Sequence, residues 1–303
     1  METVTAKATA RRAPPTVLRD YAILVKPGIM LALLISCFTA MIVAEGGLPA
    51  WPLVGATLLG GALASGSAAS LNNLLERDRD AKMRRTRKRP LPSQRMEPAH
   101  AAIFAAVLAG GSGIVLTAYA NPLAAALALC GIVFYAFVYT LWLKPLTPQN
   151  IVIGGAAGCF PALVGWSAVT GSVGVGALAI ALIVFLWTPP HFWSLALLYK
   201  EDYAEAGFPM LPVTHGEEVT RRQILLYAGA LVALTAALTP LGVLGVTYLA
   251  LSMALGAVFF AEAALLFKTR ERAAARRLFR YSNAYLALLG AAMVTDVLLR
   301  TAA

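Results

Sequence analysis

Nine runs of apolar residues, each about 20 residues long, alternate with short polar segments along the chain. The runs cover residues 24–44, 53–75, 101–120, 122–143, 151–170, 175–198, 223–242, 245–267 and 282–299. A helix of about 20 apolar residues matches the hydrocarbon core of a bilayer. The pattern therefore predicts an all-α polytopic membrane protein with about nine transmembrane helices.

Composition supports this class of fold. Of the 303 residues, 59% are hydrophobic and only 13% are charged, whereas a soluble domain carries about 25% charged residues. The three cysteines, Cys37, Cys130 and Cys159, lie within apolar runs without metal-ligand spacing. We interpret them as small core residues, and most of the surface should face lipid.

The distribution of lysine and arginine predicts the orientation of the chain. With nine spans, each of the 25 basic residues except Arg300 falls on one side, which the positive-inside rule identifies as cytoplasmic. We expect residues 1–22 to form a disordered cytoplasmic tail and residues 23–303 to form one transmembrane domain with a periplasmic C-terminus. The net charge of +10 is then explained by the basic cytoplasmic loops, so we expect no nucleic acid as a partner.

The loop after the second run (residues 76–100, the second loop) carries the strongest chemical signal. Asn72, Glu76 and Asp80 are spaced four apart, so they share one helix face over about 12 Å. Oxygen ligands in such a row suit Mg²⁺ together with substrate phosphates. Nine basic residues lie nearby, and Pro90 and Pro92 should stop the helix. The alternative is a topology anchor with salt-bridged acids.

A second acidic segment follows the sixth run (residues 199–222, the sixth loop). Asp202 and Glu205 are candidate ligands of a second metal, and the alternative is an ordinary polar loop. The two loops face each other only if the helices close into a ring. Metal ligands, arginines and an apolar interior together suit a prenyl diphosphate, whose leaving group metals and arginines stabilise.

Residues 72–93, NNLLERDRDAKMRRTRKRPLPS, resemble the signature of the UbiA-type intramembrane prenyltransferases. The family pattern N-x-x-x-D-x-x-x-D falls on Asn72, Glu76 and Asp80, with glutamate at the middle position. Residues 83–91, 139–158 and 188–212 are similar to the branch that farnesylates heme. The second acidic motif departs from the family form, because Ala206 stands four residues after Asp202.

This resemblance implies a ring of nine helices around a central cavity. It implies transfer of the farnesyl group of farnesyl diphosphate to a vinyl group of heme B, giving heme O for heme-copper oxidases. Mg²⁺ is the implied cofactor, and the implied location is the bacterial inner membrane with the active site at the cytoplasmic face. Heme A synthase and oxidase assembly proteins are the implied protein partners.

The resemblance also suggests a role for each candidate residue. Asn72, Glu76, Asp80 and Asp202 would hold Mg²⁺ and the diphosphate as catalytic residues. Arg85 and Arg89 would contact phosphate or a heme propionate. Lys144, after the fourth run, would bind the diphosphate, and Tyr203 would border the cavity.

His191 lies inside the sixth run, directly after Pro189 and Pro190. An ionisable side chain at that depth is costly unless it has a partner or a function. We expect a contact with heme, and the alternative is a bond to a backbone carbonyl that the prolines leave free.

Three rival functions remain open from the sequence. One is a related prenyltransferase that acts on a quinone precursor or a chlorin. The others are a small-solute transporter and an oxidase assembly factor without catalysis of its own.

Overall fold

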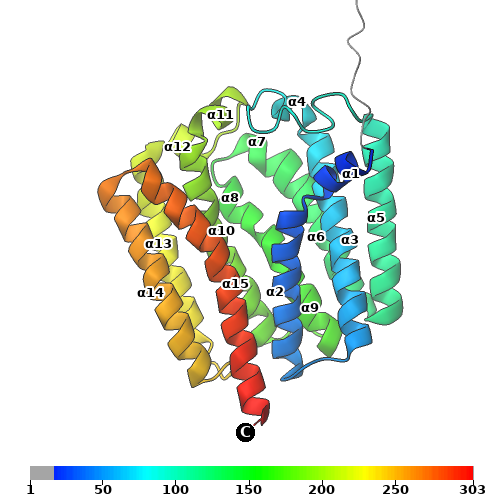
Figure 1. The fold of residues 1–303 in the computed structure, drawn as a ribbon, viewed down its shortest axis with the longest axis vertical. Coiled ribbons are helices and arrows are strands. Elements are labelled where there is room, and N and C mark those ends of the chain that lie inside the picture. Colours follow the sequence, from blue (N-terminus) through cyan, green and yellow to red (C-terminus); the bar gives the residue numbers. More distant parts are fainter. Residues whose placement is uncertain (1–16, 303) are drawn as a thin grey trace, which may run out of the picture.

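The computed structural model describes residues 17–302, which contain helices and no strand (Figure 1). The long elements are α2 (Pro27–Glu45), α3 (Trp51–Leu75), α5 (Pro98–Tyr119), α6 (Pro122–Val133), the π-helix η1 (Phe134–Leu143), α9 (Phe160–Thr170), α10 (Val175–Leu198), α13 (Gly216–Ala237), α14 (Val246–Thr269) and α15 (Arg272–Ala302). The short ones are α1 (Val17–Val25), α4 (Arg77–Asp80), α7 (Lys144–Leu146), α8 (Asn150–Gly154), the 3₁₀ turn η2 (Gly155–Cys159), α11 (Lys200–Glu205) and α12 (Leu211–Thr214).

The predicted class of fold is confirmed. Each of the nine apolar runs lies in its own helical stretch, and eight stretches are long and apolar enough to cross a membrane. The exception within residues 17–302 is α13, whose first two turns carry Glu217, Glu218, Arg221 and Arg222. The exact number of crossings and the side of each terminus stay predictions.

Three predicted boundaries are wrong. Residues 17–22, expected in the tail, belong to α1, whereas residues 1–16 lie outside the described part. Helices α13 and α15 begin seven and ten residues before the runs at 223 and 282. The first turns of α15 are amphipathic, with Ala274, Ala275 and Leu278 buried beneath exposed arginines, so charge does not end the helix there.

The helices close the predicted ring (Figure 1). One side consists of α2, α3, α5 and α6, and η1, α8 and η2 link it to a second side of α10, α13, α14 and α15. Helix α15 packs against α2, and this contact closes the ring. Helix α9 packs against α2, α6 and α10 near the end where the C-terminus lies. An open cavity at the centre of the ring stays a prediction.

The opposite end of the ring carries the short helices (Figure 1). Here α4, α7, α11 and α12 follow the ends of α3, η1 and α10. The second, fourth (residues 144–150) and sixth loops therefore gather at one end of the molecule, as the span count predicts.

Candidate active site

The predicted acidic row exists and is buried. The backbone N–H of Glu76 donates to the carbonyl of Asn72 (3.0 Å), and that of Asp80 donates to Glu76 (2.8 Å). These i to i−4 bonds carry the helical path from α3 into α4, so the three side chains share one face. Asn72, Glu76 and Asp80 are 2%, 4% and 1% exposed. A row of acids without solvent needs partners, because burying an unpaired charge is costly.

The second loop folds back over this row. The helix ends at Asp80 rather than at Pro90, so the predicted stop is wrong by ten residues. The hydroxyl of Thr86 donates to the Asp80 carbonyl (2.8 Å), which turns the chain. Further along the loop, the Arg89 guanidinium forms an ion pair with Asp80, with Nη1 2.7 Å from Oδ2.

The fourth transmembrane stretch supplies two further partners in register. Asn72 Nδ2 donates to Thr140 Oγ1 (3.0 Å), and Lys144 forms an ion pair with Glu76. The two residues of each pair are 68 positions apart in the sequence. This equal spacing is expected when two helices run parallel and stay in the same register over both contacts. Thr140 lies in η1, and π-helical segments are rare and concentrate at functional sites.

Lys26 is a site residue that sequence analysis assigned only to the charge pattern. It lies between α1 and α2 with φ 51°, a left-handed conformation that is uncommon outside glycine. Its Nζ donates to Asn72 Oδ1 (2.5 Å). In the sequence, Lys26 could have been noticed only because it precedes Pro27 and Gly28 at the start of an apolar run.

The sixth loop meets the second, as the ring requires. Arg85 Nη2 approaches Tyr203 Oη at 3.5 Å, and the Arg79 guanidinium lies 5.1 Å from the centre of the Phe208 ring. Lys144 Nζ lies 4.6 Å from the same ring. Tyr203 is buried, and burial raises its pKa to about 12, so its hydroxyl remains protonated at neutral pH.

Asp202 lies in α11 and is partly exposed. Within residues 17–302, no hydrogen bond or ion pair joins Asp202 to another side chain. The same residues contain no group of three or more His, Cys, Asp or Glu side chains close enough to hold a metal ion. A role for Asp202 or for Glu205 in metal binding stays a prediction.

His191 has partners outside the acidic row. Its Nδ1 lies 2.8 Å from the hydroxyl of Ser282 in α15, and its ring stacks between Trp187 and Phe279. The partner is a hydroxyl rather than the freed backbone carbonyl considered as the alternative. Contact with heme stays a prediction.

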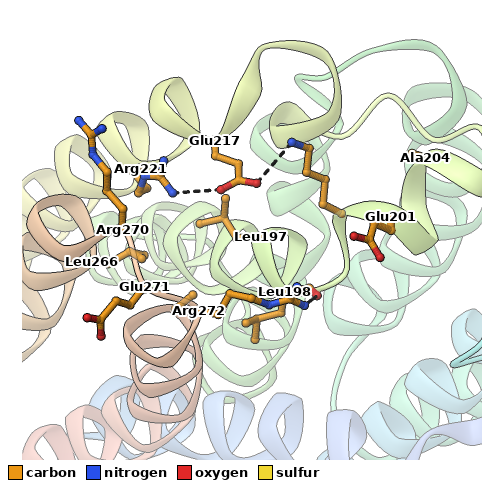
Figure 2. Close-up of a pocket in the computed structure, with 12 residues that line it drawn as sticks. Leu197, Leu198, Glu201, Ala204, Glu217, Arg221, Leu266, Arg270, Glu271 and Arg272 are labelled. Carbon is orange, nitrogen blue, oxygen red and sulfur yellow. Dashed lines mark hydrogen bonds and ion pairs between the residues drawn. The ribbon is translucent and has the colours of Figure 1, made fainter.

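A separate pocket of about 350 Å³ lies where the ends of α10, α11, α13, α14 and α15 meet (Figure 2). Three of its charged side chains pair with one another. Glu217, labelled at its centre, binds both Lys200 (3.3 Å) and Arg221 (3.1 Å). Lys200, Glu201 and Ala204 of α11 line this pocket, whereas Tyr203 of the same helix contacts Arg85. The pocket is therefore distinct from the acidic row.

The chemistry of the acidic row fits a magnesium diphosphate. Mg²⁺ is usually held by one or two carboxylates plus substrate phosphates. Oδ1 of Asp80 is buried and has no hydrogen-bond partner, so one carboxylate oxygen is available to a ligand. Three side-chain cations, Lys26, Lys144 and Arg89, surround two carboxylates. The excess positive charge favours an added anion.

Several known proteins are similar to this chain over most of its length. A relative from Gloeobacter violaceus, named protoheme IX farnesyltransferase, is 50% identical over 92% of this chain and 92% of its own length. A relative of the same name from Chloroflexus aurantiacus is 46% identical over 98% of this chain and 51% of its own length. The chain thus spans about half the length of that relative. The structure of a UbiA homolog from Archaeoglobus fulgidus bound to DMAPP and Mg²⁺ shares the fold, with a TM-score of 0.67 at 18% identity over 91% of this chain and 99% of that one.

The match to a family model is also extensive. Residues 33–289 match the UbiA prenyltransferase family, and this range contains α3, α4, η1 and α11, which carry the site. The chain therefore belongs to the UbiA prenyltransferase family.

Proposed function

We propose that this protein transfers the farnesyl group of farnesyl diphosphate to a vinyl group of heme B, which yields heme O. Relatives that are 46–50% identical and are named protoheme IX farnesyltransferase support the choice of substrates. The observation that carries the proposal is the meeting of two buried carboxylates with cations from three separate segments. Glu76 pairs with Lys144, Asp80 pairs with Arg89, and Lys26 caps the row at Asn72.

Asn72, Glu76 and Asp80 would hold Mg²⁺ with the diphosphate, and bound Mg²⁺ would neutralise charge on the leaving group. Each of these residues already holds a side-chain cation. On substrate binding, Lys26, Lys144 and Arg89 would turn to phosphate oxygens, where charge-assisted hydrogen bonds are strong. Arg85 would contact phosphate or a heme propionate. Asp202 would support a second metal from α11.

The reaction then breaks the C1–O bond of farnesyl diphosphate, and diphosphate leaves. A vinyl carbon of heme B forms the new bond to C1, and the hydroxyl of a water molecule adds to the other vinyl carbon with release of a proton. The three cations Lys26, Lys144 and Arg89 stabilise the departing diphosphate, where charge develops. The stacked rings of Tyr135 and Tyr139, 5.5 Å apart beside Lys144, would stabilise the allylic cation.

We place this activity in a bacterial inner membrane, with the site at the cytoplasmic face, where heme A synthase and oxidase assembly proteins would receive heme O. The basic second loop and the bacterial relatives support this location. His191 would contact the porphyrin, since Trp187 and Phe279 already offer stacked aromatic surfaces beside it.

Labelled farnesyl diphosphate tests the choice of acceptor. Membranes that contain the protein are incubated with Mg²⁺ and either heme B or 4-hydroxybenzoate, and the products are separated by chromatography. We expect label only in a heme product, and none with Asn72→Ala or Asp80→Ala at equal membrane insertion. Label only in the phenol would instead assign the protein to quinone-precursor prenylation.

A further inference from the structure

Asn72 has two side-chain partners that lie on different elements. Its Oδ1 accepts from Lys26 Nζ at 2.5 Å, and its Nδ2 donates to Thr140 Oγ1 at 3.0 Å. Asn72 and Thr140 are both 2% exposed. Water therefore does not compete for either end of the amide, and these two contacts decide which end faces which neighbour.

The hydroxyl of Thr140 can meet Asn72 only as an acceptor. A threonine hydroxyl has one proton to donate, and Thr140 donates it to the carbonyl of Tyr135 at 2.8 Å. The remaining lone pairs can receive only a donor, which is Nδ2 of Asn72. The Lys26 ammonium offers donors alone, so it must face Oδ1. Both partners select the same orientation of the amide.

The π-helix makes this arrangement possible. Its winding brings residues i and i+5 together, so the Tyr135 carbonyl lies within reach of the Thr140 hydroxyl five residues later. Lys144, in register four residues further on, pairs with Glu76. The π-helix thus orients Asn72, and Lys144 directly after it neutralises Glu76.

We infer that Thr140 is a positioning residue, which orients the Asn72 amide so that its oxygen, and not its NH₂ group, faces the metal diphosphate. This inference rests on the proposed function. An amide turned by 180° would present two N–H groups to Mg²⁺ and could not ligate it. Thr140→Val keeps the shape of the side chain but removes the hydroxyl, so it leaves the buried Nδ2 without an acceptor.

The test measures binding rather than turnover. Purified protein is titrated with Mg²⁺ by calorimetry in the presence of inorganic diphosphate, and again with the non-hydrolysable farnesyl thiodiphosphate. We expect Thr140→Val to weaken Mg²⁺ binding about tenfold, the loss of one good hydrogen bond. Thr140→Ser keeps the hydroxyl and should restore binding to within about twofold of the wild type. Thr220→Val is the matched control, because Thr220 is fully buried and its hydroxyl bonds to the Gly216 carbonyl.

The possible outcomes separate the two claims. Wild-type binding of Mg²⁺ in Thr140→Val, or failure of Thr140→Ser to restore it, would overturn the positioning role and leave the proposed function standing. Absence of Mg²⁺ diphosphate binding by the wild type would overturn both. A fall in binding confined to Thr140→Val, with Thr220→Val unchanged, supports the inference.

Discussion

At the scale of single residues, the site is a balance of buried charges. Glu76 and Lys144 are 4% and 8% exposed, so neither charge is stable there without the other. Arg89 could be assigned from the sequence because it lies in the basic loop that follows the motif, and Lys144 could be assigned through the resemblance to the UbiA-type family. Lys26 and Thr140 could not, since their contacts span 46 and 68 residues and depend on how helices align.

Replacement of Lys144 tests this balance. Lys144→Met should lower turnover by about 10²- to 10³-fold, the effect of removing one donor from a developing anion. It should also lower thermal stability, because Glu76 is left buried and unpaired. The double variant Glu76→Gln with Lys144→Met should recover the melting temperature in detergent but not the activity.

Lys200→Met serves as the control for Lys144→Met. Lys200 pairs with Glu217 in the separate pocket and its side chain is 41% exposed. We expect turnover within about twofold of the wild type. Equal losses in Lys144→Met and Lys200→Met would mean that general positive charge, rather than the pair with Glu76, supports the reaction.

At the scale of elements, close helix contacts hold the ring together. A Cβ atom on Gly165 of α9 would lie 2.1 Å from the Cys37 carbonyl oxygen of α2, and a backbone atom cannot move aside alone. Small residues permit such approaches between membrane helices. The nine apolar runs predicted the long helices but not the short ones between them. The starts of α13 and α15 were missed because charged residues continue these helices beyond the apolar segment.

Gly165→Ala should therefore destabilise the protein by about 1–3 kcal/mol, the usual cost of overpacking. The measurement is thermal unfolding in detergent, followed by size-exclusion chromatography. Gly113→Ala is the matched control, because the nearest atom to its added Cβ would be a leucine methyl at 3.7 Å. Equal melting temperatures for the two variants would contradict the close contact of α2 with α9.

At the scale of the whole molecule, closure of the ring unites three loops that are far apart in sequence. The second, fourth and sixth loops meet through Glu76 with Lys144 and through Arg85 with Tyr203. The order of spans and the one-sided charge predicted that these loops share a face. The sequence could not show that they touch, because this depends on how the helices that carry them, such as α3 and η1, pack together.

Cysteine labelling tests the predicted orientation of that face. In a variant lacking Cys37, Cys130 and Cys159, a single cysteine is placed at Arg84 or at Ser172, which are both exposed. Arg84 lies in the segment after α4 and Ser172 in the segment after α9, and these two helices lie toward opposite ends of the ring. A membrane-impermeant maleimide should label Arg84→Cys only in inverted vesicles and Ser172→Cys only in right-side-out vesicles. The reverse pattern would place the site on the periplasmic face.

Reconstitution with purified components tests the central claim most directly. The purified protein in lipid vesicles receives Mg²⁺, farnesyl diphosphate and heme B, and the products are identified by mass spectrometry. We predict a product with the mass of heme B plus one farnesyl group and one hydroxyl group, formed by the wild type and not by Asp80→Ala. Unchanged heme B with folded wild-type protein, or equal product from Asp80→Ala, would contradict the account.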